Sequence, residues 1–258
     1  MIMNNTYKKS TLYESEKILL ETLRNTYPES EKALFVADGL CWADISNNMP
    51  DTSNCNWPEC LWTDSKRRVL FLLKEPNGNG NEDYKDWNWA VKNEPFGNAL
   101  AYWLEGIITT TPIYCPKYEE LPPRESIFKK RPLAIVNLKK IAGGSSADWN
   151  EIWKFAKRDK EFLVAQIRDI LKPNIIVCCG SNDRNDWNEK VIAIALDCIF
   201  PDKKNDFKKI NDWCYYDSDG DILLIDSYHP SYPISNTIKI NMLFHGFQDF
   251  ILKCKYVD

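Results

Sequence analysis

Four short and almost wholly apolar runs, separated by segments long enough to form helices, constrain the fold of this 258-residue chain more than any other feature. Continuous apolar runs of this length are typical of strands that are buried on both faces, as in parallel sheets. Strands that alternate with helices predict a mostly parallel, doubly wound sheet. The predicted strands are residues 68–73, 133–137, 175–179 and 222–226. We therefore expect an α/β fold with three αβα layers and a central four-stranded, mostly parallel sheet.

Apolar residues at helical spacing predict the elements between these strands. The predicted helices are residues 11–27, 96–107, 148–157, 160–171, 186–197 and 237–253. Residues 38–66 contain Trp, Asn and Pro without a clear period and are expected to be irregular. We expect one domain over residues 1–258, with residues 1–66 forming an amino-terminal helix and an irregular extension.

Charge and cysteine usage exclude some classes of protein. A net charge of −4 argues against a strongly cationic nucleic-acid binder, although it leaves room for a local basic face. No apolar run approaches the length of a membrane span, and the polar start lacks the apolar core of a signal peptide. Nine cysteines without an export signal favour reduced thiols in the cytoplasm. We expect a cytoplasmic monomer without a membrane partner.

Four cysteines outside the predicted strands are candidate ligands for a metal ion. These are Cys41, Cys55, Cys60 and Cys115. No Cys-x2-Cys pair occurs among them, although such pairs are typical of zinc and iron–sulfur sites. We expect neither a metal nor a cofactor, while ligation by these four thiols stays open as the alternative.

Each predicted strand ends in a polar or glycine-containing segment. The carboxyl ends of parallel strands share one edge of the sheet, which is where such folds bind ligands. Glu75, Asn137 and His229 follow or end three of the strands, and Pro230 terminates the last of them. We expect these three side chains to converge on one pocket.

These segments resemble, in the same order, the motifs of the uracil-DNA glycosylase superfamily over about residues 68–252. The matching segments are Leu73-Lys74-Glu75-Pro76-Asn77, Pro95-Phe96-Gly97-Asn98, Ala134-Ile135-Val136-Asn137, the strand that ends in Gly180, and His229-Pro230-Ser231. The resemblance implies a single-domain glycosylase fold. It also implies an enzyme that flips uracil or a modified base out of single- or double-stranded DNA and hydrolyses its N-glycosidic bond, without lyase activity.

The resemblance also implies roles for individual residues. Glu75 and His229 are the expected catalytic pair, because a carboxylate stabilises a cationic sugar and a donor stabilises the departing base. The expected base-binding residues are Asn137, Phe96 and Asn77. The expected DNA-binding residues are Ser231, Tyr232, Ile234, Lys139 and Lys140, with Ile234 as the wedge that fills the place of the flipped base.

Departures from the family motifs keep other interpretations open. The first motif has Leu73 in place of glycine and Glu75 in place of Asp or Asn. Asn77 stands where uracil-selective members have tyrosine, which predicts a pocket open to a 5-substituted pyrimidine. Glu75 could also be a solvated loop charge, Asn137 the end of a strand, Phe96 a core residue, and Tyr232 and Ile234 packing residues. The alternative functions are a non-catalytic nucleic-acid or nucleotide-binding protein on the same fold, and an unrelated α/β enzyme acting on small nucleotides.

Overall fold

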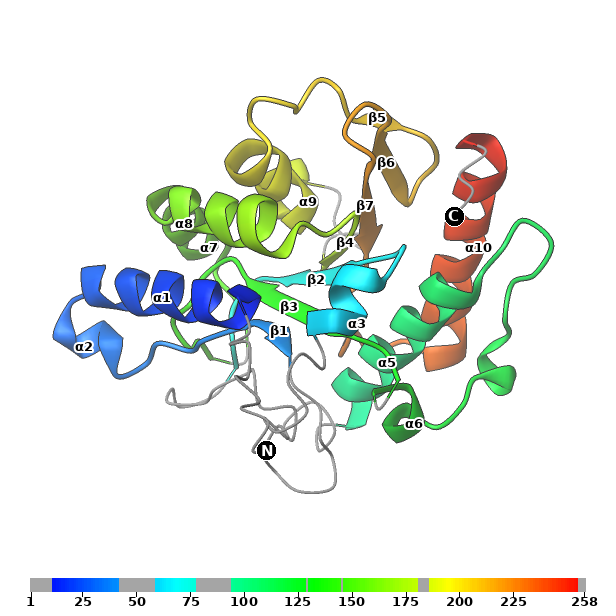
Figure 1. The fold of residues 1–258 in the computed structure, drawn as a ribbon, viewed down its shortest axis with the longest axis horizontal. Coiled ribbons are helices and arrows are strands. Elements are labelled where there is room, and N and C mark those ends of the chain that lie inside the picture. Colours follow the sequence, from blue (N-terminus) through cyan, green and yellow to red (C-terminus); the bar gives the residue numbers. More distant parts are fainter. Residues whose placement is uncertain are drawn as a thin grey trace, which may run out of the picture.

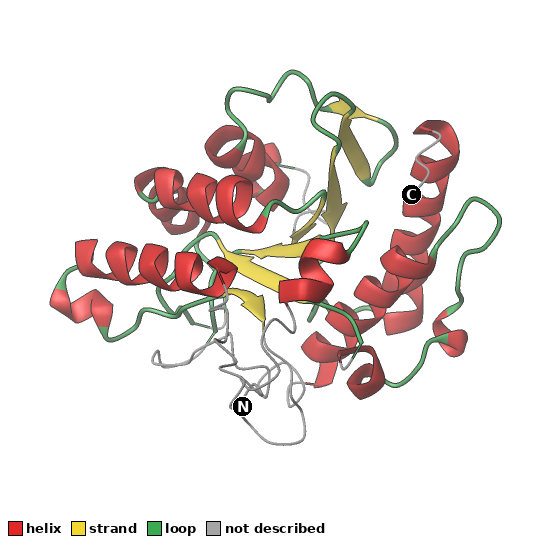
Figure 2. Ribbon diagram, viewed as in Figure 1, coloured by secondary structure: helices red, strands yellow, loops and turns green. Residues whose placement is uncertain are grey.

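The computed structural model describes residues 11–41, 59–77, 94–128, 130–144, 146–180 and 186–254. These residues form a seven-stranded sheet in the order β1-β3-β2-β4-β7-β6-β5, with helices packed against both of its faces (Figures 1 and 2). The strands are β1 (Gly39–Cys41), β2 (Val69–Leu73), β3 (Leu133–Asn137), β4 (Ile175–Cys179), β5 (Lys208–Lys209), β6 (Cys214–Asp217) and β7 (Ile222–Ser227).

The four predicted strands are confirmed as β2, β3, β4 and β7. They are neighbours in the sheet, and the pairs β2–β3, β2–β4 and β4–β7 are all parallel. Every residue of β2, β3 and β4 is buried, which explains why their sequences are apolar without alternation. The expected mixed α/β class with a mostly parallel central sheet is therefore correct.

The predicted number of four strands is wrong, because three further strands extend the sheet at its edges. β1 pairs antiparallel with β3, while β6 and β5 continue antiparallel from β7. β1 has three residues and β5 has two, so neither is long enough to show the alternation that predicts a strand. Short, charged strands are a common way to end a sheet, and β5 consists of two exposed lysines.

Helices cover both faces of the sheet. The described helices are α1 (Thr11–Thr26), α2 (Glu29–Lys32), α3 (Glu59–Asp64), α5 (Glu94–Thr109), α6 (Arg124–Phe128), α7 (Trp149–Arg158), α8 (Lys160–Val164), α9 (Val191–Ile194) and α10 (Asn236–Cys254). α8 and α9 continue into π-helical turns at Ala165–Leu171 and Ala195–Ile199. The predictions for α1, α7 and α10 match within one residue at each end. None of the described helices combines the length and the apolar character needed to cross a membrane.

Two hydrophobic clusters fix the layers. Alternate residues of the central strands, such as Phe71 and Ile135, pack with α5 and α10. The residues between them, such as Leu72 and Val136, pack with α7, α8 and α9. Because successive side chains of a strand point to opposite faces, this division decides which strand-end residues share a face.

The contact between α5 and α10 predicts a strong effect at Gly106. A Cβ atom at this position would lie 1.8 Å from the ring of Phe244. We expect Gly106→Ala to lower the free energy of unfolding by about 1–3 kcal/mol, since overpacking outweighs the better helix propensity of alanine. Urea unfolding measures the change, with Gly144→Ala as the control because no atom lies within 4 Å of that position. Equal stability of the two variants would contradict the packing described.

Candidate active site at the carboxyl edge of the sheet

The ends of β2 and β3 stay paired beyond the strands themselves. The backbone N–H groups of Leu138 and Lys139 donate to the carbonyl oxygens of Leu73 and Lys74, both at 2.9 Å. Farther on, Asn77 forms an isolated parallel bridge with Gly143. The segments that carry Glu75 and Asn137 therefore leave the sheet side by side.

The ends of β4 and β7 meet the end of β2 at Gly180. The N–H of Gly180 donates to the carbonyl of Ser227 at 3.0 Å. A Cβ atom on Gly180 would lie 3.4 Å from Cε of Lys74 and 3.7 Å from Cβ of His229. The ends of β2, β4 and β7 thus lie close together around Gly180, with Lys74 and His229 beside it, while the convergence of Glu75, Asn137 and His229 on one pocket stays a prediction.

His229 is held in a neutral form. Burial, together with the positive charges of Lys74 and Lys239, lowers the pKa of His229 to about 4. Its Nδ1 atom accepts a hydrogen bond from the backbone N–H of Ser231 at 3.2 Å. An acceptor nitrogen carries no proton, so the proton of the neutral ring is on Nε2. His229 therefore offers one N–H donor at neutral pH.

An aromatic ring lies next to this donor. The ring centroids of Phe96 and His229 are 6.1 Å apart, with 45° between the ring planes. Phe96 is 7 % exposed and belongs to the same hydrophobic cluster as Leu73. Phe96 is thus a core residue, as the alternative interpretation of the sequence expected, and its ring lies beside the histidine; its contact with a base stays a prediction.

A buried lysine holds the loop that follows His229. The ammonium group of Lys239, in α10, donates to the carbonyl oxygens of Pro230 at 2.5 Å and Tyr232 at 3.3 Å. The N–H of Tyr232 in turn donates to the carbonyl of His229 at 2.8 Å. Burial lowers the pKa of Lys239, and these carbonyl oxygens solvate its ammonium group in place of water.

The residues expected to contact DNA in this loop differ in their surroundings. Ser231 is exposed and Ile234 is half-buried. The Tyr232 ring stacks on Tyr228, with centroids 5.1 Å apart and 20° between the planes. Tyr232 is therefore a packing residue in this structure, while Ser231 and Ile234 keep accessible surface.

Glu75 lies in an ion pair. Its Oε2 atom accepts a hydrogen bond from Nζ of Lys139 at 2.6 Å, and the two side chains are 8 % and 13 % exposed. A Cβ atom on Gly143 would lie 2.2 Å from the same carboxylate oxygen, so a larger residue there would displace the Glu75 carboxylate. Glu75 is not a solvated loop charge. Lys139, expected to bind DNA, instead holds this carboxylate in place, while Asn77 is exposed at the same edge.

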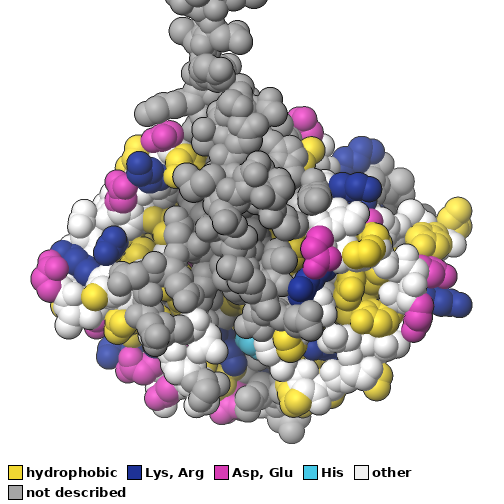
Figure 3. Space-filling view, turned by 90° about the horizontal axis from the view of Figure 1, so that it is seen from below, with side chains coloured by type: hydrophobic (Ala, Val, Ile, Leu, Met, Phe, Trp, Pro, Cys, Tyr) yellow, Lys and Arg dark blue, Asp and Glu magenta, His cyan; other side chains and the backbone are white. Residues whose placement is uncertain are grey.

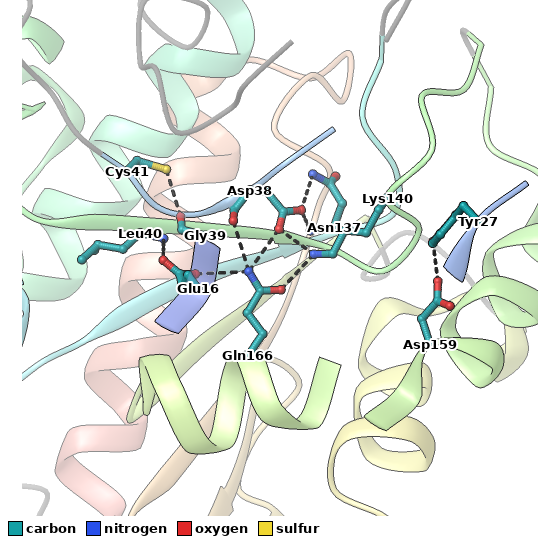
Figure 4. A network of polar contacts seen from close by, with 10 residues as sticks. All are labelled: Glu16, Tyr27, Asp38, Gly39, Leu40, Cys41, Asn137, Lys140, Asp159 and Gln166. Atoms are coloured by element: carbon teal, nitrogen blue, oxygen red, sulfur yellow. Dashed lines mark hydrogen bonds and ion pairs between the residues drawn. The ribbon is translucent and has the colours of Figure 1, made fainter. Parts of the chain in front are cut away.

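Asn137 is held by a residue that the sequence did not single out, Asp38 (Figure 4). Oδ2 of Asp38 accepts hydrogen bonds from the backbone N–H of Asn137 at 2.7 Å and from its Nδ2 at 3.2 Å. A carboxylate can only accept, so the amide nitrogen is the end that faces Asp38. Oδ1 of Asn137 is buried and has no hydrogen-bond partner among the described residues. The amide keeps one acceptor and one N–H for a ligand.

The prediction that Lys140 binds DNA is wrong, because its side chain is buried. The side chain is 1 % exposed, and its ammonium group pairs with Oδ1 of Asp38 at 2.5 Å and Oε1 of Gln166 at 3.0 Å (Figure 4). Gln166 also donates to Glu16 at 3.2 Å. Lys140 therefore neutralises a buried carboxylate and is too far inside the protein to meet a phosphate.

The described residues include only part of the set of four cysteines that could bind a metal ion. Cys55 is not described, and neither is the side chain of Cys60. Cys41 is buried beside the carbonyl of Gly39, and Cys115 is half-buried. In the part of the chain that the structure describes, no group of three or more His, Cys, Asp or Glu side chains is arranged to hold a metal ion.

Three residues of the site were missed in the sequence. Lys239 had a usable signal, because it lies four residues before Leu243 on the apolar face of the last helix. Lys74 directly precedes Glu75 but resembled any solvated lysine. Asp38 had no signal, since its partners Asn137 and Lys140 are about a hundred residues away in the chain.

The surface around this edge carries charges of both signs. β7 runs toward the lower side of Figure 1, and Figure 3 shows the molecule from below. Among the described side chains on that face, Lys and Arg alternate with Asp, Glu and hydrophobic groups, so no broad basic surface is visible there.

A comparison with protein-family models and a comparison with curated proteins both found no match to this chain.

Proposed function

We propose that this chain is a divergent member of the uracil-DNA glycosylase superfamily that flips a uracil or a modified base out of DNA and hydrolyses its N-glycosidic bond. The observation that carries the proposal is the neutral His229 at the end of β7, with its N–H donor beside the Phe96 ring. The parallel order of the four predicted strands and the pairing of their ends support it further.

The proposed reaction follows from these groups. The bond between the sugar carbon and the base nitrogen breaks, its electron pair leaves with the base, and a water molecule adds to the sugar carbon and gives up a proton, which ends on the departed base. The N–H of His229 stabilises the developing charge on the base oxygen. Glu75 stabilises the cationic sugar and orients the water. Asn137 reads the base edge through its remaining acceptor and N–H.

One observation favours a second candidate function, non-catalytic nucleic-acid or nucleotide binding on the same fold. The carboxylate of Glu75 is already paired with Lys139 at 2.6 Å. A paired carboxylate stabilises a nearby cation less than an unpaired one, so the structure is also compatible with a site that binds without cleaving.

Base release tests the proposal directly. The protein is incubated with single-stranded and duplex oligonucleotides that carry uracil, a thymine mispair or a bulky 5-modified cytosine, and abasic sites are converted to breaks by alkali. Strand breaks that appear only after alkali would support a glycosylase without lyase activity. A mobility shift without abasic sites on any of these substrates would support the binding-only function.

Glu75 provides a matched pair of variants for this assay. We expect Glu75→Gln to slow base release tenfold or more, because the side chain keeps its size and loses the charge that stabilises the cationic sugar. Single-turnover rates measure the effect. Glu105→Gln is the control, since Glu105 is also a partly buried carboxylate in an ion pair, with Arg131 at 2.8 Å. Equal rates in the two variants would remove Glu75 from the mechanism.

A further inference from the structure

A cavity lies between α7 and residues 186–197. Its volume is about 680 Å³, and its wall includes Trp149, Trp153, Lys154 and Lys157 of α7. The two tryptophans are four residues apart and therefore lie on the same side of the helix, about 6 Å apart along its axis. Both side chains are half-buried, so each indole keeps a surface that a ligand can reach.

Lys74 connects this cavity to His229. Its ammonium group lies 5.3 Å from the centroid of the Trp149 ring. A Cβ atom on Gly180 would lie 3.4 Å from Cε of Lys74 and 3.7 Å from Cβ of His229, and the charge of Lys74 contributes to the low pKa of that histidine. Trp149 is thus separated from the proposed catalytic histidine by a single lysine side chain.

The charges of the cavity fit a base better than a phosphate. Asp186, Glu189 and Asp197 line it together with the two lysines of α7. Asp186 accepts a hydrogen bond from the N–H of Asn188 at 2.9 Å, and Asp197 pairs with Lys204 at 2.5 Å. The wall is therefore of mixed charge and has no cluster of cations that would hold a phosphate inside the cavity, whereas the uncharged faces of the indoles suit an aromatic ring.

We propose that this cavity binds unpaired bases of single-stranded DNA next to the nucleotide held at His229, with the neighbouring base stacked on Trp149 and the following one on Trp153. The proposal rests on the proposed function, because it specifies single-stranded DNA as the form of DNA that this site binds. Stacking on aromatic rings is the usual way to bind single strands without sequence preference, and it needs bases that are not paired.

Two cation–π contacts give this binding a mechanism. Lys74 lies against Trp149, and Nζ of Lys157 lies 5.0 Å from the centroid of Trp153. A base that stacks on Trp153 takes the place of the ammonium group of Lys157, which then pairs with a phosphate of the same strand. This exchange brings a positive charge to the phosphates of the strand. Such a charge is needed in a chain of net charge −4, in which Lys140 is buried and Lys139 is paired with Glu75.

Equilibrium binding tests the proposal. Fluorescence anisotropy of a short labelled single strand and of its duplex is measured with the wild type, Trp149→Ala, Trp149→Phe and Tyr114→Ala. We expect Trp149→Ala to weaken single-strand binding roughly 5- to 100-fold, the usual range for one stacked base, and to leave duplex binding unchanged. Trp149→Phe retains most of the affinity. Tyr114→Ala binds like the wild type, because Tyr114 is an exposed aromatic outside the cavity, 47 % accessible.

A second measurement covers the case in which Trp149→Ala folds poorly. Single-stranded DNA is expected to quench tryptophan fluorescence of the wild type more than that of Trp149→Phe at equal saturation. Unchanged single-strand affinity in a folded Trp149→Ala variant, or equal quenching in Trp149→Phe, would overturn the proposal. Loss of single-strand binding in Trp149→Ala, together with a wild type that releases no base, would support this site and reject the glycosylase reaction.

Discussion

Replacing His229 with alanine is expected to slow base release by about 100- to 1,000-fold at neutral pH, which is the usual effect of removing one preorganised donor to a developing anion. The reason is that the ring of His229 has only one donor, and this donor is free to face the base. Ser231 occupies Nδ1, so the one remaining polar atom of the ring is the Nε2–H donor. Single-turnover rates with saturating protein measure the chemical step.

The chain contains a natural control for this variant. His245, on the exposed side of α10, is the other of its two histidines. His245→Ala is expected to release the base at the wild-type rate. If both histidine variants are as fast as the wild type, the donor to the leaving base lies elsewhere.

The low pKa of His229 also predicts how the stability of the protein depends on pH. Its ordinary pKa is 6.5, and the folded value is about 4. Between these values the unfolded chain binds a proton that the folded protein does not, so the free energy of unfolding falls as the pH drops through this window. The loss contributed by this group reaches about 3 kcal/mol near pH 4 and is absent above pH 7.

Urea unfolding at several pH values checks this dependence. His229→Gln removes the titrating group, so its stability should fall less steeply than that of the wild type between about pH 6.5 and pH 4. Identical slopes for the two proteins would mean that folding does not shift the pKa of His229, so that the ring is not held neutral by its surroundings as proposed.

Asp38→Asn is expected to cost about 3–5 kcal/mol of unfolding free energy, the largest loss of stability in this set. The two oxygens of Asp38 accept from Asn137, Lys140 and Gln166, and an amide of the same size has only one oxygen for these donors. The substitution also leaves the ammonium group of Lys140 buried without its counter-charge, which is the costly part.

A double-mutant cycle identifies the cause of this loss. Adding Lys140→Met to Asp38→Asn removes the unpaired ammonium group, so the double variant should recover part of the stability. The surface ion pair of Asp202 with Arg168 serves as the control, since Asp202→Asn is expected to cost less than about 1 kcal/mol. A loss at Asp38 as small as that at Asp202 would contradict a buried network.

The same network explains why the position of Asn137 could be predicted while its surroundings could not. Continuous apolar runs identify buried strands, so the sequence placed Asn137, Glu75 and His229 at strand ends correctly. Which side chain each of them meets depends on residues distant in the chain. Asp38 reaches Asn137 from the segment before β1, a three-residue strand without a recognisable pattern.

The sequence by itself determined the parts of this protein that depend on local burial: the four central strands, the helices between them and the polar ends at one edge of the sheet. Only the tertiary structure decided the strand order, the three edge strands and the roles of the charged residues. Lys139 and Lys140 are adjacent in the sequence and look alike there. Lys139 pairs with Glu75 at that edge, whereas Lys140 is enclosed with Asp38. A charge becomes a surface group or a buried counter-ion according to what packs around it, and the packing brings together segments separated by tens to a hundred residues.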